Sequence, residues 1–563
     1  MNRKLYGIFL AAGFLASSFL TSCSSSSNSH IIPPPPATTP FAFYLTGQEA
    51  PNTANGNQIS YYSLAGAVTI DANGNVTAGE QDYNDAFGIT SPQPGGDSIT
   101  GGTLTVDATG QGTLTLITSN ALVGAAGTET LAVQFVNADH ALISQFDGSA
   151  TSSGSMDLQT SLTSAPSGAF AFTVSGVDPN YFPFAIGGVF TLPGAATDVV
   201  DLNDAGVVTP GTALTVSLGT PDAFGRGVVT TSLTGISLNY YVVGPEAIRI
   251  IDVDTTDAAV GSAFGQGSNA TGGSNASIVP AIFGVSGNPW SGIYYSTAGQ
   301  ITPDATTGTF TGVGESAEME THLSGAASVL AGTYSIAGNG YGSLGISGFG
   351  GGDVSAFQVY ATDPTLDLMD PNNANGNPDV GGVLLLDFDT ALSGGTGVAI
   401  AQTDTTSTDF NGTYAAGWQN FNALLGNNVC FGCEFDLVEQ GTMASGGALG
   451  PLNAEISDPF QTLAAGVTTT PGTFTGTPTP DPNPANAGRF SMLTTDAGGP
   501  LGASIPNSSV TFFDAVVYQA SASELFWIEF DFDSVFLGSL EQQGSLTGVP
   551  AVVRPANTRV KQK

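Results

Sequence analysis

The chain has 563 residues, and 41% of them are hydrophobic, which is enough for several packed cores. Only 10% are charged, and nine Lys and Arg against 46 Asp and Glu leave a formal net charge of −37 at pH 7. A nucleic-acid binder neutralises phosphates with Lys and Arg, and a nucleotide site of the P-loop type carries a Gly-rich loop ending in Lys. The chain has neither feature, which excludes nucleic acids and nucleotides as partners.

The N-terminus predicts export. A short positive segment precedes an apolar stretch from Leu5 to Leu20, which is shorter than the ~20 residues that span a bilayer and suits a secretory signal. The residues Leu20-Thr-Ser-Cys23 resemble a lipobox, the cleavage site of bacterial lipoproteins. The resemblance implies a signal peptide over 1–22, acylation of Cys23 and anchoring in the membrane through the acyl chains. Ser24 after the cysteine implies the outer membrane or cell surface, and a plain secretory signal is the alternative.

Both ends of the mature chain are expected to lie outside the folded domains. Residues 23–40 are predicted to form a tether, in which a Ser/Asn-rich part is flexible and Pro33–Pro36 is semi-rigid. Residues 547–563 are predicted to form a basic disordered tail, because four of the nine basic residues lie there. The region between them contains no lysine and three arginines, Arg226, Arg249 and Arg489.

The composition favours strands over helices. Gly, Thr, Val and Phe are frequent, whereas a helical protein carries Ala, Leu, Glu and Lys on its exposed positions. Apolar and polar residues alternate through Phe526–Asp533, which is the period of a half-buried strand. Asn73-Gly74 between two short β-branched runs predicts a tight hairpin. The expected fold class is therefore all-β.

Landmarks that recur in the same order indicate internal repeats. An aromatic opening occurs at Phe41–Gly47, Phe170–Gly176, Gly292–Tyr294 and Gly412–Tyr414. An Asp-x-Asn-Asp-Ala segment follows in the first two repeats, at Asp82–Ala86 and Asp201–Ala205. A Gly-x-Gly hairpin signal comes next, at Gly110–Gly112, Gly225–Gly227, Gly340–Gly342 and, degenerate, Gly488–Phe490. An acidic step and a Gly-x4-Gln strand close each repeat, at Gly154–Gln159, Gly261–Gln266, Gly397–Gln402 and Gly538–Gln543.

These landmarks predict tandem domains over 41–160, 165–268, 285–403 and 408–546. Each is expected to be an antiparallel meander of about eight strands that closes into a small barrel or folds into a sandwich. The Gly-x-aromatic openings resemble those of lipocalin-type and avidin-type barrels. The whole chain resembles uncharacterised bacterial lipoproteins with tandem Gly/Asn/Asp-rich β-repeats, and this resemblance implies no known activity.

Groups for catalysis are scarce. His140 and His322 are the histidines of the predicted domains, and both are interpreted as surface residues because neither stands beside a nucleophile or a metal-ligand pair. Catalytic residues are therefore not predicted, and an enzyme is not expected. Cys430 and Cys433, outside a reducing compartment, are interpreted as a structural disulfide, with redox work as the alternative.

Carboxylates are the remaining candidates for chemistry. Acids at positions i and i+2 of a strand lie ~7 Å apart on one face, and a divalent cation would relieve their repulsion. Calcium is therefore a hypothetical cofactor, with ligands at Asp71, Asn73, Asn75, Asp82, Asp85, Asp201, Asp204, Asp252, Asp254, Asp387, Asp389, Asp531 and Asp533. Hairpin turns and solvated acidic faces are the alternative, which the sequence favours.

Two functions fit these features. The first is a lipid-anchored envelope protein whose β-domains serve a structural or adhesive purpose, with an extracellular polysaccharide or protein as partner. The second is a lipoprotein that binds a glycan or small ligand in barrel lumens or on aromatic faces. A glycoside hydrolase that uses paired carboxylates is a more distant third. An open lumen would favour the second function, and a filled lumen the first.

Overall fold

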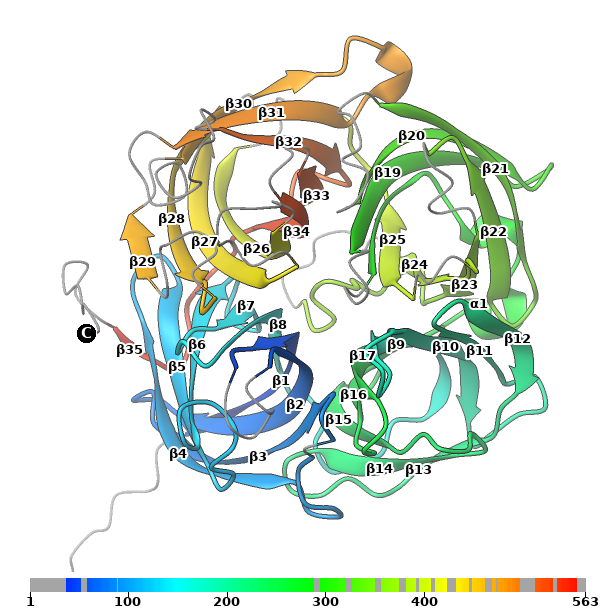
Figure 1. The fold of residues 1–563 in the computed structure, drawn as a ribbon. Coiled ribbons are helices and arrows are strands. Elements are labelled where there is room, and N and C mark those ends of the chain that lie inside the picture. The colour runs from blue at the N-terminus through cyan, green and yellow to red at the C-terminus, as the bar shows by residue number, and fades with distance from the viewer. Residues whose placement is uncertain are drawn as a thin grey trace, which may run out of the picture. The chain divides into compact units, whose positions relative to one another are not determined.

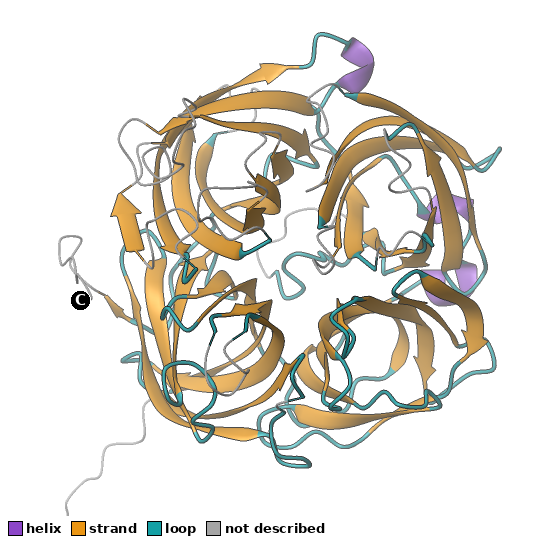
Figure 2. Cartoon of the chain, in the orientation of Figure 1, coloured by secondary structure: helices purple, strands orange, loops and turns teal. Residues whose placement is uncertain are grey.

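The structure is a computed structural model that describes residues 37–51, 58–88, 90–287, 294–318, 327–349, 356–373, 381–390, 394–406, 411–422, 432–444, 448–460, 468–471, 474–496, 512–529 and 534–553. These residues belong to one compact unit, Ala37–Lys563. Strands dominate (Figure 2), and the described helical segments are α1 (Asn269–Gly272) and the short 3-10 turns η1 (Asn275–Ser277) and η3 (Pro484–Asn486). None of these helices is long and apolar enough to cross a bilayer. The all-β prediction is confirmed.

Four antiparallel sheets follow one another along the chain, and Figure 1 shows each of them in its own range of colours. We call them repeats 1 to 4. In repeat 1 each strand pairs with its chain neighbours, β1 pairs with β8, and the pairing of β3 with β4 completes the ring. Its strands are β1 (Thr38–Glu49), β2 (Ser60–Asp71), β3 (Val76–Asp85), β4 (Asp97–Val106), β5 (Gln111–Thr118), β6 (Thr128–Phe135), β7 (His140–Gln145) and β8 (Ala150–Leu158).

Repeat 2 has nine strands, in line with the expected number of about eight. The additional strand arises because the segment between β11 and β14 is divided into β12 and β13, which form the two ends of the sheet. The first strand, β9, pairs with the last, β17. The strands are β9 (Gly168–Val177), β10 (Pro183–Leu192), β11 (Val199–Asp204), β12 (Val207–Ala213), β13 (Val216–Leu218), β14 (Arg226–Thr231), β15 (Leu238–Gly244), β16 (Ala247–Asp252) and β17 (Ala258–Gly265).

Repeat 3 is a closed barrel of eight strands, in the order β18 to β25. Of the two architectures expected from the sequence, barrel and sandwich, it adopts the first. Its strands are β18 (Ala281–Gly287), β19 (Tyr295–Asp304), β20 (Thr309–Glu318), β21 (Ser328–Ile336), β22 (Tyr341–Ser347), β23 (Ala356–Ala361), β24 (Gly382–Asp387) and β25 (Thr396–Ala401).

Repeat 4 adds a short strand, β29, to the edge of β28, and the ring closes through a single residue pair between β28 and β30. The first strand, β26, pairs with the last, β34, as in the other repeats. The strands are β26 (Gly412–Asn422), β27 (Glu434–Ala444), β28 (Ala448–Ser457), β29 (Thr468–Pro471), β30 (Phe474–Pro480), β31 (Arg489–Asp496), β32 (Phe512–Gln519), β33 (Glu524–Glu529) and β34 (Ser534–Gln542).

Three predicted boundaries need correction. β1 begins at Thr38, inside the predicted tether. β18 begins at Ala281, before the predicted start of repeat 3 at 285, because Phe283–Gly287 is the true counterpart of the aromatic opening. Part of the predicted disordered tail is a strand, β35 (Val552–Val553), which pairs with β4, and Val549 packs against the core of repeat 1.

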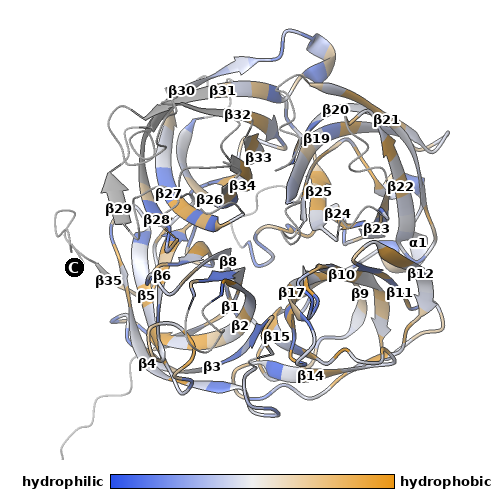
Figure 3. Cartoon of the chain, in the orientation of Figure 1, coloured by the Kyte–Doolittle hydropathy of each residue, from blue (hydrophilic) through white to orange (hydrophobic). Residues whose placement is uncertain are grey.

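Each repeat encloses its own apolar core, built from the inward residues of its strands. Figure 3 shows both apolar and polar residues along single strands, as expected for sheets with one buried face. In repeat 3 the remaining space among Phe283, Leu344 and Phe357 is about 10 Å³, which is no more than one water molecule needs. Among the described residues, the interior of repeat 3 is therefore largely filled by side chains at this point.

Candidate functional site

A glutamine side chain joins each repeat to the next. The final residue of every Gly-x4-Gln landmark donates its amide N–H to backbone carbonyl groups of the following repeat, and repeat 4 donates to repeat 1, so the contacts form a closed cycle. We call these glutamines the clasp residues. The bonds run from Gln159 to Phe224 (2.9 Å) and Val242 (2.7 Å), from Gln266 to Asn339 (3.0 Å) and Ala361 (3.1 Å), from Gln402 to Gln519 (2.8 Å), and from Gln543 to Thr109 (2.9 Å) and Phe135 (2.6 Å).

The clasp residues meet the first glycine of the Gly-x-Gly landmark. Gly110, Gly225, Gly340 and Gly488 all adopt positive φ, between +77° and +93°, which L side chains rarely tolerate. A β-carbon at Gly340 would also lie 2.5 Å from the amide nitrogen of Gln266. Two of the four landmarks that indicate repeats in the sequence, Gly-x-Gly and Gly-x4-Gln, are therefore parts of one contact between repeats.

The middle residue of Gly-x-Gly reaches an acid of the preceding repeat at Arg226, Tyr341 and Arg489. All of these acids are buried. The contacts are Arg226 Nε to Asp82 Oδ2 at 2.8 Å, Tyr341 Oη to Asp201 Oδ1 at 3.1 Å and Arg489 Nε to Glu315 Oε1 at 2.8 Å. Asp82 and Asp201, two of the hypothetical calcium ligands, are thus occupied by donors of the protein itself.

The third arginine forms a buried ionic network between repeats 1 and 2. Arg249 Nη2 lies 2.5 Å from Asp157 Oδ2, and its guanidinium carbon lies 4.6 Å from the centre of the Tyr44 ring. His140 Nδ1 lies 2.8 Å from the other oxygen of Asp157. Burial has the largest single effect on the pKa of Asp157 and raises it. The charge of Arg249 and the hydrogen bond from His140 together outweigh burial and lower this pKa to about 2.

The prediction that His140 is a surface residue is wrong, because the side chain is 1% exposed. Its Nε2 lies 3.2 Å from Glu541 Oε2 of repeat 4, so the imidazole stands between two carboxylates. Burial opposes protonation, but the charge of Glu541 and the hydrogen bonds to Asp157 and Glu541 raise the pKa of His140 well above its usual value. The two carboxylates therefore favour the protonated form of the imidazole.

A cavity of about 340 Å³ lies among the four repeats. This volume is at the lower end of the range of small-molecule sites. Serine and threonine hydroxyls line much of it, together with Arg249, His140 and Glu541 and the aromatic rings of Tyr44 and Phe264.

The glycines of the Gly-x4-Gln landmarks, Gly154, Gly261, Gly397 and Gly538, all line this cavity. In the first three, a β-carbon would lie 1.9 to 2.0 Å from a backbone carbonyl oxygen of the neighbouring first strand. Glycine is required there because the two strands approach too closely for any side chain. The landmark therefore builds both the wall of the cavity and the clasp beside it.

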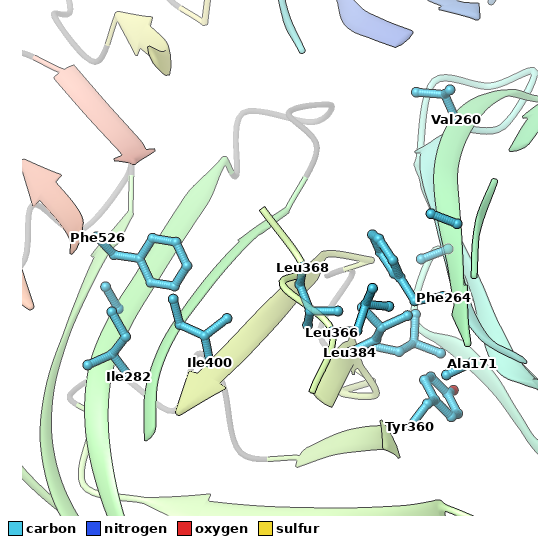
Figure 4. Close-up of a cluster of buried hydrophobic side chains, with 14 of the residues drawn as sticks. Ala171, Val260, Phe264, Ile282, Tyr360, Leu366, Leu368, Leu384, Ile400 and Phe526 are labelled. Carbon is cyan, nitrogen blue, oxygen red and sulfur yellow. The ribbon is translucent and has the colours of Figure 1, made fainter. Parts of the chain in front are cut away.

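Apolar side chains from different repeats also pack together. In Figure 4, Phe526 of repeat 4 lies beside Ile282 and Ile400 of repeat 3, and Leu384 of repeat 3 lies near Phe264 of repeat 2. This shared cluster buries residues that are separate in the sequence, which favours a single cooperative unit over independent domains.

The Asp71 loop is a hairpin turn. Asp71 Oδ1 accepts the backbone N–H groups of Asn73 (2.8 Å) and Asn75 (2.9 Å), and the Asn75 amide donates to both carboxylate oxygens. Asp85 similarly accepts the N–H of Phe87, and Asp204 is partly exposed at the end of β11. Hydrogen bonds of this kind are typical of hairpin turns, which the sequence favours as the alternative to calcium binding.

Acids at the ends of β16 and β24 are buried rather than solvated. Asp252 and Asp387 are 0% exposed, because an asparagine of the preceding repeat covers each turn. Asn84 donates to the carbonyl of Asp252 at 3.1 Å, and Asn203 donates to that of Asp387 at 3.0 Å. Asp254 and Asp389, the second acids of the two pairs, lie at the edges of the same turns.

Several predicted site residues lie outside the described residues, namely Cys23, Cys430, Asp531, Asp533 and His322. Cys433 is fully buried and disulfide-bonded. Its pairing with Cys430 stays a prediction, as does the acylation of Cys23.

No family model matches the chain, and no curated protein matches it. Among solved structures, two mutants of the vaccine antigen transferrin binding protein B from Haemophilus parasuis Hp5 are similar at 11% and 12% identity, each with a TM-score of 0.20. The matches cover 74% of this chain and 86% and 83% of those chains. A TM-score this low does not place the chain in a family.

Proposed function

We propose that the chain is a non-catalytic envelope lipoprotein. In this proposal an acylated Cys23 holds the protein at the outer membrane or cell surface. The folded unit Ala37–Lys563 then serves as a rigid support whose outer loops contact a polysaccharide or protein outside the cell.

The observation that carries the proposal is the contact from repeat 4 back to repeat 1, made by Gln543. A chain of independent domains has no need for such a contact. The three arginines of the region 37–553 are also all buried at joints between repeats, where each neutralises a buried acid.

We expect the Cys23→Ser variant of the full chain to lose its lipid. Cells fed with radiolabelled palmitate should label the wild-type protein, which should sediment with the outer membrane and be cut by protease added to intact cells. The variant should take up no label and leave the membrane fraction, because a thioether at residue 23 is the attachment point. Labelled C23S protein, or unlabelled wild type, would contradict the anchoring.

A second candidate function is the binding of a small polar ligand in the cavity among the repeats. The observation that favours it is the combination of about 340 Å³ with hydroxyl, aromatic and charged lining groups. This candidate differs from the barrel lumens suggested by the sequence, because the cavity lies among the repeats and not inside one of them.

We expect the Ser153→Phe variant to separate the two candidates. Ser153 lines the cavity, whereas Ser217 on β13 is exposed and serves as the control site for the same substitution. If the cavity is a sugar site, saturation-transfer NMR with glucose and N-acetylglucosamine should show binding to wild type and to S217F and at least tenfold weaker binding to S153F. Absence of any signal from the wild type rejects these sugars as ligands.

A further inference from the structure

The turn after β16 brings three carboxylates together. Asp252, Asp254 and Asp257 each offer an oxygen atom, and these atoms lie within 4.8 Å of one another. Asp252 is fully buried, and the other two are partly exposed. Asn84 of repeat 1 holds the turn in place by donating its amide N–H to the carbonyls of Asp252 and Asp257.

One oxygen of this cluster lacks a donor. Asp252 Oδ1 accepts the backbone N–H of Asp254 at 2.9 Å. Asp252 Oδ2 is buried without a hydrogen-bond partner among the described residues. Buried carboxylate oxygens are costly to leave unsatisfied, so this atom itself points to a missing ligand.

Repeat 3 shows what the partner of such an oxygen looks like. Asp387 occupies the same position at the end of β24, and its Oδ2 accepts a hydrogen bond from the Tyr295 hydroxyl. In repeat 3, Tyr295 of the second strand pairs with Gly287 of the first strand. The residue that corresponds to Gly287 in repeat 2 is Gly176, and it pairs with Phe184. Repeat 2 has therefore lost the hydroxyl and kept the acid.

The chain supplies no basic side chain to take its place. The only Lys and Arg residues in the region 37–553 are Arg226, Arg249 and Arg489, and each is paired with an acid elsewhere. Asp178 and Asp204 add further negative charge near Asp257. Neutralisation must come from a proton or from a cation in solution.

We propose that Asp252, Asp254 and Asp257 bind a calcium ion at the joint between repeats 1 and 2. All three are hard oxygen ligands, which calcium prefers. Calcium tolerates a flexible arrangement of oxygen ligands, whereas magnesium demands near-ideal octahedral geometry and usually keeps several of its waters. Water completes the shell on the side of the exposed acids. The site goes beyond the proposed support function, which does not require it.

Calorimetric titration of the soluble fragment 37–563 with calcium chloride, after treatment with chelator, tests the proposal. We expect a site with a dissociation constant of about 10⁻⁴ to 10⁻³ M, as in extracellular calcium modules. Asp252→Asn and Asp254→Asn should each weaken binding at least tenfold, and Phe184→Tyr should weaken it as well because its hydroxyl would take the open oxygen. Magnesium should bind more weakly than calcium.

Asp107→Asn is the matched control. Asp107 accepts the backbone N–H and the hydroxyl of Thr109 at 2.7 and 2.6 Å, the same distances that Asp254 shows to Thr256. No acid cluster among the residues that the structure describes includes Asp107. Its variant should bind calcium as the wild type does. The proposal is overturned if the wild type takes up no calcium, or if folded D254N, checked by circular dichroism, binds as tightly as D107N. Neither result touches the Cys23 experiment, so the two proposals fail separately.

Discussion

Replacing Arg249 with methionine is expected to lower the free energy of unfolding by about 3–5 kcal/mol, the cost of removing one partner from a buried ion pair. Methionine keeps most of the side-chain volume but leaves the Asp157 carboxylate, which is 1% exposed, without its main counter-charge. The contact with the Tyr44 ring is lost as well. Urea unfolding of the fragment 37–563 measures the change.

The double variant Arg249→Met/Asp157→Leu provides the control. It removes both charges at once, and buried pairs replaced by apolar residues of similar size are often neutral in stability. We expect most of the loss to be recovered, which a double-mutant cycle would express as a coupling energy. If the double variant is no more stable than R249M alone, the loss comes from packing and the ion pair is not its cause.

Acid should reduce the difference in the free energy of unfolding between R249M and the wild type. The folded-state pKa of Asp157 is lowered to about 2, below the unfolded value of about 3.9. Its contribution to stability is therefore present above about pH 4 and lost as the pH falls towards about 2. His140 acts in the opposite sense, because its raised pKa contributes stability below about pH 6.5 that is lost as the pH rises through the folded-state value. Unfolding at pH 3 and 5 follows the Asp157 contribution, and unfolding at pH 7 and above follows that of His140.

The sequence predicted the repeats well because their landmarks are local. Glycines with positive φ and a fixed spacing to the next strand leave a visible pattern, and Gly110 and Gly225 are examples. The structural role of the landmarks, which is to join one repeat to the next, was not predictable. Gln159, for example, donates to the carbonyl of Val242 in the next repeat. Such a contact depends on how whole sheets meet, which no spacing within one repeat records.

His140 shows the same limit at the level of one residue. A lone histidine far from any cysteine or nucleophile in the sequence is reasonably interpreted as a surface residue. Its partners, Asp157 and Glu541, come from two different repeats. The useful signal was the scarcity of basic residues: with three arginines in 37–553, each is needed to neutralise a buried acid.

The acidic steps illustrate why a residue pattern alone could not select a cation site. Asp252-Val-Asp254 and Asp387-Phe-Asp389 are nearly the same sequence. The difference lies in Phe184 and Tyr295, which stand far from these motifs in the chain and become comparable only through strand register. Without that register, the sequence gives no reason to prefer the pair Asp252 and Asp254 over the pair Asp387 and Asp389 as cation ligands.

Replacing Gly154 with alanine is expected to destabilise the protein by about 3 kcal/mol, the upper part of the usual range for overpacked sites. The added methyl would lie 1.9 Å from the carbonyl oxygen of Tyr44, so β1 and β8 must separate. These are the strands that close repeat 1 and line the cavity.

The same substitution at other glycines provides a graded series. Gly397→Ala should be about as harmful, because its nearest atom is the Gly284 carbonyl oxygen at 2.0 Å. Gly538→Ala should cost less, because the nearest atoms, Trp527 Nε1 at 2.6 Å and the Gly417 carbonyl oxygen at 2.9 Å, lie farther from the new methyl than the 1.9 Å found at Gly154. Gly95→Ala is the control, since no atom lies within 4 Å of the new methyl. Urea midpoints that follow this order support close strand approach as the reason for glycine in the landmark, and a G154A midpoint equal to that of G95A would refute it.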